Sequence, residues 1–104
     1  MSLQLTLATV KALPGHRDRV LDIWQSTAQD YIERESGFSS VYWSFDQDDE
    51  DAIIIIMVGD EAAGVDFQQQ PWFADFKEKT HDILTHDGLV RTATPKYIKG
   101  HSLG

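Results

Sequence analysis

Three side chains could take up and release a proton during a reaction: the phenol of Tyr31, the carboxylate of Asp66 and the imidazole of His81. From the 100° step of a helix, His81 lies roughly 110° from the centre of an apolar stripe running through residues 73–84. This places the imidazole at the margin of the buried side or in solvent. Two interpretations of His81 stay open, a general base at the mouth of a cavity and an exposed surface histidine.

Aromatic side chains are the second feature with chemical meaning. Four of them are the candidates for the walls of a ligand-binding cavity: Trp24, Phe67, Trp72 and Phe76. Each of the three tryptophans needs a partner for its indole N–H when buried, so they are not easily packed together in one small core. A cavity between a sheet and helices, lined by rings, suits a flat aromatic ligand. Plain core packing is the alternative for every one of these rings.

Several kinds of site are excluded by the residue types and their spacing. The sequence has no cysteine, so thiolate metal sites, disulfides and thiol nucleophiles are ruled out. His81 and His86 are five residues apart rather than four, and the acidic segment 46–51 lacks the central glycine and distal glutamate of a calcium loop. Neither a dinucleotide-binding glycine motif nor a serine-nucleophile motif is present. We therefore expect neither a metal nor a cofactor.

The charge balance argues against two classes of partner. Nine basic residues face 17 acidic ones, for a net charge of −8, which disfavours a nucleic acid backbone and an anionic membrane. No apolar run approaches the roughly 20 residues that span a bilayer. The lack of cysteine and of a secretory signal pattern favours the cytoplasm.

The chain is expected to form a single domain over residues 1–104, with flexible ends at 1–2 and 100–104. Alternation and residue type predict strands at residues 3 to about 10–13, 38–45, 53–58 and 89–98, with Pro95 marking an edge or a bulge in the last. A period of 3.6 predicts a helix over 16–35. A short helix is expected from Asp60 to about Gln69, with an interruption at Pro71. Helical spacing resumes from Trp72 to Leu84.

The predicted order of elements is β-α-β-β-α-β, the ferredoxin-like arrangement of the α+β class, in which a four-stranded antiparallel sheet carries helices on one face. Its third strand is aliphatic on both sides, with Ile53, Ile55 and Met57 on one and Ile54, Ile56 and Val58 on the other. If the helices cover only one face, three of these side chains are exposed to water. Each exposed side chain then loses roughly 1.5–3 kcal/mol of the stabilisation that burial would give. We therefore expect a second copy to cover that face in a homodimer. A strand covered locally within a monomer is the alternative.

Four stretches of the sequence resemble a known family. They are "VKALPGHRDRVLDIW", "ESGFSSVYW", "IIIIMVGDEAAGVDF" and "QQPWFADF", which are similar to the opening, the second strand, the third strand with its following helix, and the Ser-Pro-His-Phe segment of the antibiotic biosynthesis monooxygenase family. The resemblance runs from Leu5 to about Ile98. It implies a dimeric α+β barrel and oxygenation of a small aromatic or quinol-type compound by dioxygen, without a cofactor.

The chain departs from the family pattern at six places, two of which are Ser36 in the place of a proline and Trp72 in the place of a histidine. Val58 stands where members often have a tryptophan, and Phe67 stands where many have a histidine. The asparagine, tryptophan and histidine of the haem-degrading members are replaced by Ala8, Phe67 and Lys77. The resemblance therefore points away from haem degradation.

Three functions remain as hypotheses. The first is a cofactor-independent monooxygenase. The second is a binding module of the same fold, which holds a small apolar ligand or a partner without turnover. The third is an isomerase or decarboxylase, which needs the same base but no oxygen. An ionisable side chain that faces the cavity separates the enzymes from the binding module.

Overall fold

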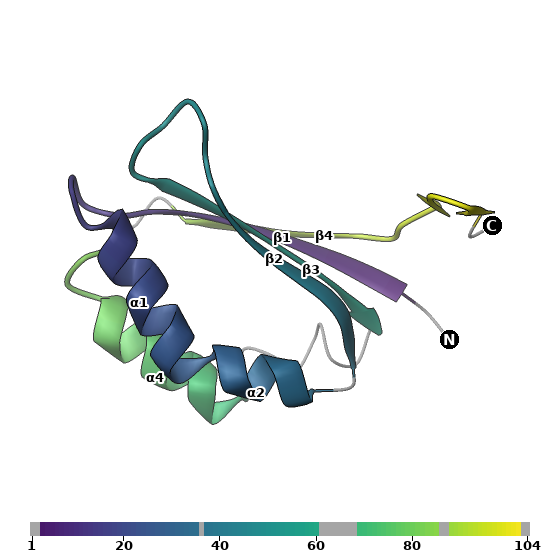
Figure 1. Ribbon diagram of the computed structural model, residues 1–104, viewed down its shortest axis with the longest axis horizontal. Coiled ribbons are helices and arrows are strands. Elements are labelled where there is room, and N and C mark those ends of the chain that lie inside the picture. The colour runs from purple at the N-terminus through teal and green to yellow at the C-terminus, as the bar shows by residue number, and fades with distance from the viewer. Residues whose placement is uncertain (1–2, 36, 61–68, 86–87, 103–104) are drawn as a thin grey trace.

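The computed structural model describes residues 3–35, 37–60, 69–85 and 88–102 and has one four-stranded antiparallel sheet with the order β2-β3-β1-β4. These strands are β1 (Leu3–Lys11), β2 (Phe38–Phe45), β3 (Ala52–Asp60) and β4 (Leu89–Ala93). The helices are α1 (Arg17–Thr27), α2 (Gln29–Arg34) and α4 (Pro71–Thr80). All three lie on the same side of the sheet (Figure 1). The predicted ferredoxin-like arrangement is confirmed.

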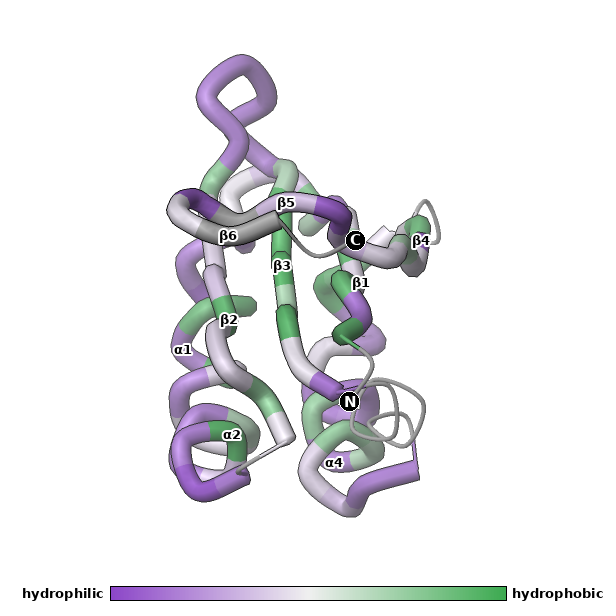
Figure 2. Tube along the Cα trace, turned by 90° about the vertical axis from the view of Figure 1, so that its right-hand side faces the viewer, coloured by the Kyte–Doolittle hydropathy of each residue, from purple (hydrophilic) through white to green (hydrophobic). Residues whose placement is uncertain are grey.

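The central strand β3 alternates between two apolar faces. Ile53, Ile55 and Met57 are buried against the helices at 0%, 6% and 3% exposure, whereas residues 54, 56 and 58 are only half-buried on the opposite face. Figure 2 shows the hydrophobic colouring along β3 between its neighbours. The pairing Leu5 with Val58, and Leu7 with Ile56, places further leucines on the face away from the helices. We call this face, which carries Leu5, Leu7, Tyr42, Ile54, Ile56 and Val58, the open sheet face.

The predicted single helix over 16–35 is wrong, because the chain breaks at Ala28 into α1 and α2. Ala28 has φ −111° and ψ −33°. Just before it, the hydroxyls of Ser26 and Thr27 donate hydrogen bonds to the carbonyl of Ile23 at 3.0 and 2.7 Å. Hydroxyls that bond the backbone within a helix compete with its own hydrogen bonds and bend it. After the break, Ile32 stays buried but Tyr31 is 40% exposed, so Tyr31 does not belong to the buried stripe.

Proline residues mark the boundaries of two further elements. At Pro71, where an interruption was predicted, α4 begins, and this position suits proline because the first turn of a helix makes no use of the N–H that proline lacks. Asp60 is the last residue of β3, and the short helix expected to follow it over 61–68 lies outside the described residues, so the capping role of Asp60 stays a prediction. The last strand ends at Ala93, before Pro95, instead of continuing to residue 98.

Beyond Pro95 the chain forms a hairpin of its own, β5 (Tyr97–Ile98) and β6 (His101–Ser102). Gly100, with φ 91°, makes its turn, a conformation that favours glycine. The hairpin is a separate two-stranded sheet that projects beyond the end of the main sheet (Figure 1). Part of the stretch expected to be flexible, residues 101 and 102, is thus in a strand.

Candidate functional site

Aromatic rings from three elements meet between the sheet and the helices. The ring of Trp24 on α1 lies 5.6 Å from Trp43 on β2, 5.7 Å from Trp72 and 5.6 Å from Phe76 on α4, measured between centroids. Phe73 adds an edge-to-face contact with Trp72 at 5.8 Å. We call these five rings the ring cluster. It exists because α1 and α4 pack side by side across the sheet face on which β2 presents Trp43 (Figure 2).

Three of the four predicted cavity-wall residues belong to this cluster. Trp24, Trp72 and Phe76 are 7%, 6% and 5% exposed, so each ring also serves the core. The fourth, Phe67, lies outside the described residues. Edge-to-face and tilted arrangements at these distances are the favourable geometries for aromatic pairs. The rings therefore lie between sheet and helices and contact one another, and a cavity lined by them stays a prediction.

Trp43 and Phe73 are the two members of the cluster that were not predicted as site residues, and Trp43 is the one with an unusual environment. It lies on the helix side of β2, opposite Ile55 of β3, and its side chain is half-buried. Its indole nitrogen Nε1 is buried and has no hydrogen-bond partner among the residues that the structure describes. Its alternation with Val41 and Phe45 on β2 was the signal that could have placed it beside Trp24.

Tyr31 connects the ring cluster to a cavity. Its ring lies 6.3 Å from that of Trp72, and its hydroxyl donates a hydrogen bond to Oε1 of Gln70 at 2.9 Å. An open cavity of about 280 Å³ at the surface is lined by Tyr31, Arg34 and Glu35, and the side chains of Tyr31 and Arg34 are exposed. Within it, Glu35 Oε1 accepts a hydrogen bond from the backbone N–H of Gly37 at 3.0 Å. A phenol, a guanidinium and a carboxylate thus line one cavity beside the rings.

The remaining predicted proton-transfer residues are placed differently. His81 is the C-cap residue of α4, and its side chain is 74% exposed, with Nδ1 3.0 Å from Oδ1 of Asp82. His81 is nine residues after Trp72, which corresponds to about 13 Å along the helix axis. The structure therefore brings Tyr31 to the ring cluster and leaves His81 in solvent at the other end of α4. Asp66 lies outside the described residues.

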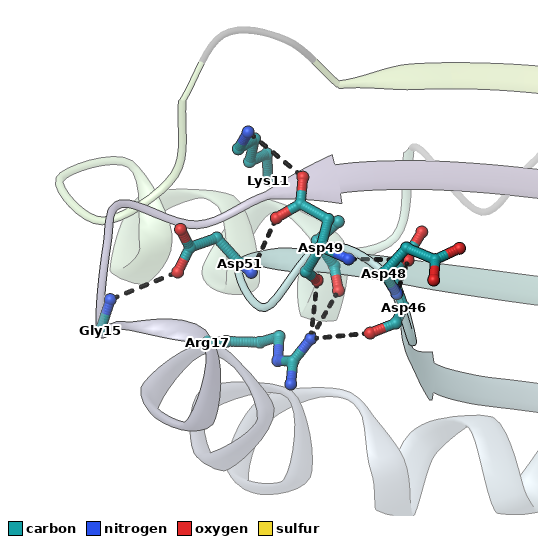
Figure 3. A network of polar contacts seen from close by, with 8 residues as sticks. Lys11, Gly15, Arg17, Asp46, Asp48, Asp49 and Asp51 are labelled. Carbon is teal, nitrogen blue, oxygen red and sulfur yellow. Dashed lines mark hydrogen bonds and ion pairs between the residues drawn. The ribbon is translucent and has the colours of Figure 1, made fainter.

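The acidic loop between β2 and β3 is held by its own hydrogen bonds and by basic side chains (Figure 3). Arg17 Nη1 donates to the carbonyl oxygens of Asp46, Asp49 and Ala52 at 3.2, 3.0 and 3.3 Å, and its guanidinium lies 4.0 Å from the centre of the Phe45 ring. Lys11 Nζ lies 3.2 Å from Asp49 Oδ2. In the part of the chain that the structure describes, no three histidine, aspartate or glutamate side chains gather closely enough to hold a metal ion.

The carboxyl group of Asp49 in this loop has a lowered pKa. The backbone N–H of Asp51, which donates to Asp49 Oδ1 at 2.9 Å, is the main cause that lowers the pKa of Asp49, and Lys11 lowers it further. Both favour the charged carboxylate. The loop is thus a structural network at the opposite end of α1 from Tyr31.

Among the described residues, no helix combines the length and the apolar character needed to cross a membrane. A search of proteins with curated descriptions finds no match.

Solved structures share the fold. A protein from Chloroflexus aurantiacus J-10-fl, provisionally assigned as an antibiotic biosynthesis monooxygenase, is 24% identical with a TM-score of 0.75, and the alignment covers 99% of this chain and 100% of that chain. One from Nitrosomonas europaea with the same provisional assignment has a TM-score of 0.82 at 9% identity, with 92% of each chain covered. A conserved protein from Methanosarcina mazei Go1 has a TM-score of 0.80 at 11% identity, covering 92% of this chain and 95% of that one.

The sequence itself identifies the family. The profile of the family described as antibiotic biosynthesis monooxygenase matches residues 5–79, a stretch that runs from β1 to α4. This stretch contains every member of the ring cluster together with Tyr31 and its cavity. The chain belongs to the antibiotic biosynthesis monooxygenase family.

Proposed function

We propose that the protein is a cofactor-independent monooxygenase that acts on a small aromatic or quinol-type compound. The observation that carries the proposal is the contact between the ring cluster and a cavity with ionisable walls, made by Tyr31, Arg34 and Glu35. Rings supply a surface on which a flat substrate can stack, and the ionisable groups supply proton transfer and charge. Membership of the family supports the same class of reaction.

The reaction balances without an external reductant. A quinol that loses a proton becomes electron-rich enough to reduce dioxygen. One oxygen atom of dioxygen bonds to a ring carbon to give a hydroxyquinone, and the other leaves as water. All four electrons that reduce dioxygen come from the quinol. The protein has to remove the proton, orient the ring and exclude bulk water. No cofactor is needed for this balance.

Tyr31, Asp66 and His81 are the proposed proton-transfer groups, and the geometry favours Tyr31 among them. Its hydroxyl is oriented by Gln70, and it lines the cavity beside the rings. His81 is exposed at the far end of α4. Trp24, Phe67, Trp72 and Phe76 are the proposed substrate-binding residues.

We propose further that the active form is a homodimer joined through the open sheet face. The support is the row of half-buried aliphatic side chains on β1 and β3, together with Tyr42, which is 57% exposed on the same face. When the sheet of a second subunit packs on this face, the aliphatic side chains of both subunits are buried. The absence of cysteine from the sequence supports a cytoplasmic location.

Oxygen uptake with a panel of substituted hydroquinones and naphthohydroquinones tests the activity. We expect uptake by the wild type, a loss of about 100-fold in kcat for Tyr31→Phe, and a much smaller change for His81→Ala. The loss of kcat in Asp66→Asn completes the comparison of the three proposed proton-transfer groups. Absence of uptake above the uncatalysed rate across the panel would reject the monooxygenase.

A binding module of the same fold is the second candidate, favoured by the close packing of Trp24, Trp72 and Phe76 in the core. Binding of a quinol without oxygen uptake would support it. Conversion of a substrate under nitrogen would instead support an isomerase or a decarboxylase, because neither reaction consumes dioxygen.

A further inference from the structure

The indole N–H of Trp43 is a buried donor without a hydrogen-bond partner among the described residues. Folded proteins satisfy the large majority of their buried polar groups, because a donor that leaves water without gaining an acceptor destabilises the fold. A buried donor that persists unpaired therefore calls for an explanation in terms of a ligand or a bound water.

The surroundings of Trp43 supply rings rather than acceptors. Its ring is tilted 37° against Trp24 at 5.6 Å, and its partner on the neighbouring strand is Ile55. Both neighbours are apolar and buried. An acceptor brought to Nε1 must therefore arrive on a molecule that is itself mostly apolar and flat, since it has to lie among rings.

The rings also connect Trp43 to the cavity at Tyr31. Trp24 touches both Trp43 and Trp72, and Trp72 in turn touches Tyr31. Tyr31 lines the cavity of about 280 Å³. A series of ring contacts thus links the cavity at Tyr31 with Trp43, whose indole N–H is unpaired.

We propose that Trp43 is the residue that selects an oxygenated aromatic ligand over a hydrocarbon, by donating a hydrogen bond from Nε1 to a hydroxyl, phenolate or carbonyl oxygen of the ligand. The inference rests on the proposed function in one respect, namely that the ring cluster binds the substrate. It goes further by assigning a specificity-determining donor. A donor fixed in an apolar site favours an acceptor with negative charge, so Trp43 also helps to hold a quinol in its deprotonated form.

Nuclear magnetic resonance of the wild-type protein tests the contact directly. The sequence has three tryptophans, so a ¹⁵N-labelled sample gives three indole N–H signals, and the one missing in Trp43→Phe belongs to Trp43. Titration with 1-naphthol should move this signal to the higher proton frequency typical of a stronger hydrogen bond. Titration with naphthalene, which has the same rings and no oxygen, should not. Equal responses to the two compounds, or none, would overturn the proposal.

Affinity measurements on two matched variants separate hydrogen bonding from packing. Trp43→Phe keeps a ring and removes the N–H, and we expect it to weaken 1-naphthol about 5- to 30-fold while changing naphthalene less than about 2-fold. Phe76→Leu should weaken both compounds by similar factors, because the phenylalanine side chain has no polar atom and its replacement removes ring contact only. If Trp43→Phe weakens both compounds equally, Trp43 only packs and the assignment fails.

The outcome is distinguishable from that of the proposed function. A selective 1-naphthol contact at Trp43 without oxygen uptake would uphold the inference and reject the oxygenase. Oxygen uptake by a protein whose Trp43 signal does not shift with 1-naphthol would support the oxygenase and reject the inference about Trp43. The titration uses the wild type, and the Trp43 signal can also be assigned through nuclear Overhauser contacts to Ile55, its partner on β3, so a variant that fails to fold does not remove the test.

Discussion

The carbonyl oxygen of Gly37 lies where a side chain on Gly59 would begin, since a Cβ placed on Gly59 would be 2.3 Å from it. The same oxygen accepts a hydrogen bond from the N–H of Asp60 at 2.9 Å. Backbone, rather than a flexible side chain, therefore closes the space. We expect Gly59→Ala to lower the free energy of unfolding by about 1–3 kcal/mol or more.

Urea denaturation of two alanine variants measures this effect. Gly88→Ala is the matched control, because a Cβ there would lie 3.4 Å from its nearest neighbour, the carbonyl of Thr9. Its stability should stay within about 1 kcal/mol of the wild type. Equal stabilities of the two variants would contradict the close approach of Gly59 to Gly37.

Trp24 is the residue on which the ring cluster depends. It touches three other rings and is 7% exposed. Trp24→Ala should destabilise the protein by about 3–5 kcal/mol, because it removes a large buried side chain and leaves a cavity. Tyr97→Ala, at a side chain that is 69% exposed, should change the stability by less than about 0.5 kcal/mol. A small effect at Trp24 would mean that the cluster is not part of the core.

Ile56 tests the homodimer. It sits on the open sheet face between Leu7 and Tyr42, so Ile56→Lys places a charge in the proposed interface, although water can still solvate it in a single subunit. We expect sedimentation velocity to give twice 11.8 kDa for the wild type and a single subunit for the variant, with unchanged far-ultraviolet circular dichroism.

Two lysine variants serve as controls for that experiment. Gln25→Lys, on the exposed side of α1, should remain dimeric. Ile55→Lys, on the buried side of the same strand as Ile56, should unfold the chain. A wild type that sediments as one subunit at tens of micromolar would contradict the homodimer.

Arg17 ties the loop between β2 and β3 to the start of α1. Its three carbonyl contacts and its place over Phe45 suggest a loss of about 1–3 kcal/mol for Arg17→Ala. Arg17→Lys should recover only part of the lost stability, since an ammonium group cannot stack on the Phe45 ring as the planar guanidinium does. Amide hydrogen exchange should accelerate over residues 46–52 in both variants. Arg19→Ala, on the exposed surface of α1, is the control and should leave that exchange unchanged.

Asp49 makes part of the stability depend on pH. Because its pKa is lowered in the folded protein, mainly by the Asp51 N–H and then by Lys11, its contribution is present above the ordinary value of 3.8. It is lost as the pH falls through the lower, folded value. We expect Asp49→Asn to be less stable than the wild type at pH 7, with a difference that shrinks towards pH 3. Lys11→Met should reduce the same difference. A gap that stays constant with pH would contradict this assignment.

Most of the fold was predictable because the strands carry clear residue signals. Residues 38–45 were predicted as a strand and form β2, and the polar segment 46–51 is the hairpin loop before β3. The break at Ala28 was missed because a helical period of apolar residues continues through it, while the hydroxyls of Ser26 and Thr27 act on the backbone and leave no mark in the period. The early end of β4 before Pro95 followed the known behaviour of proline, but its position was not predictable to the residue.

The candidate site was predictable in its rings and less so in its polar groups. Trp24, Trp72 and Phe76 share helix faces that point to the sheet, so their meeting follows from periodicity. Arg34 and Glu35 were missed because a pair of charged residues at a helix end resembles any solvated surface. The unpaired N–H of Trp43 depends on which atoms surround it in three dimensions, and no sequence pattern encodes that.

The two aliphatic faces of β3 have a consequence for how the strand finds its place. In most strands, a shift of the pairing register by one residue exposes apolar side chains and buries polar ones, which is unfavourable. In β3, such a shift replaces one isoleucine by another along most of the strand. Gly59 removes this near-degenerate alternative, because a slipped strand would bring Val58 or Asp60, each with a Cβ, against the Gly37 carbonyl. The close approach of Gly59 to Gly37 thus opposes a shifted alignment of the central strand by steric exclusion, where hydrophobicity discriminates little.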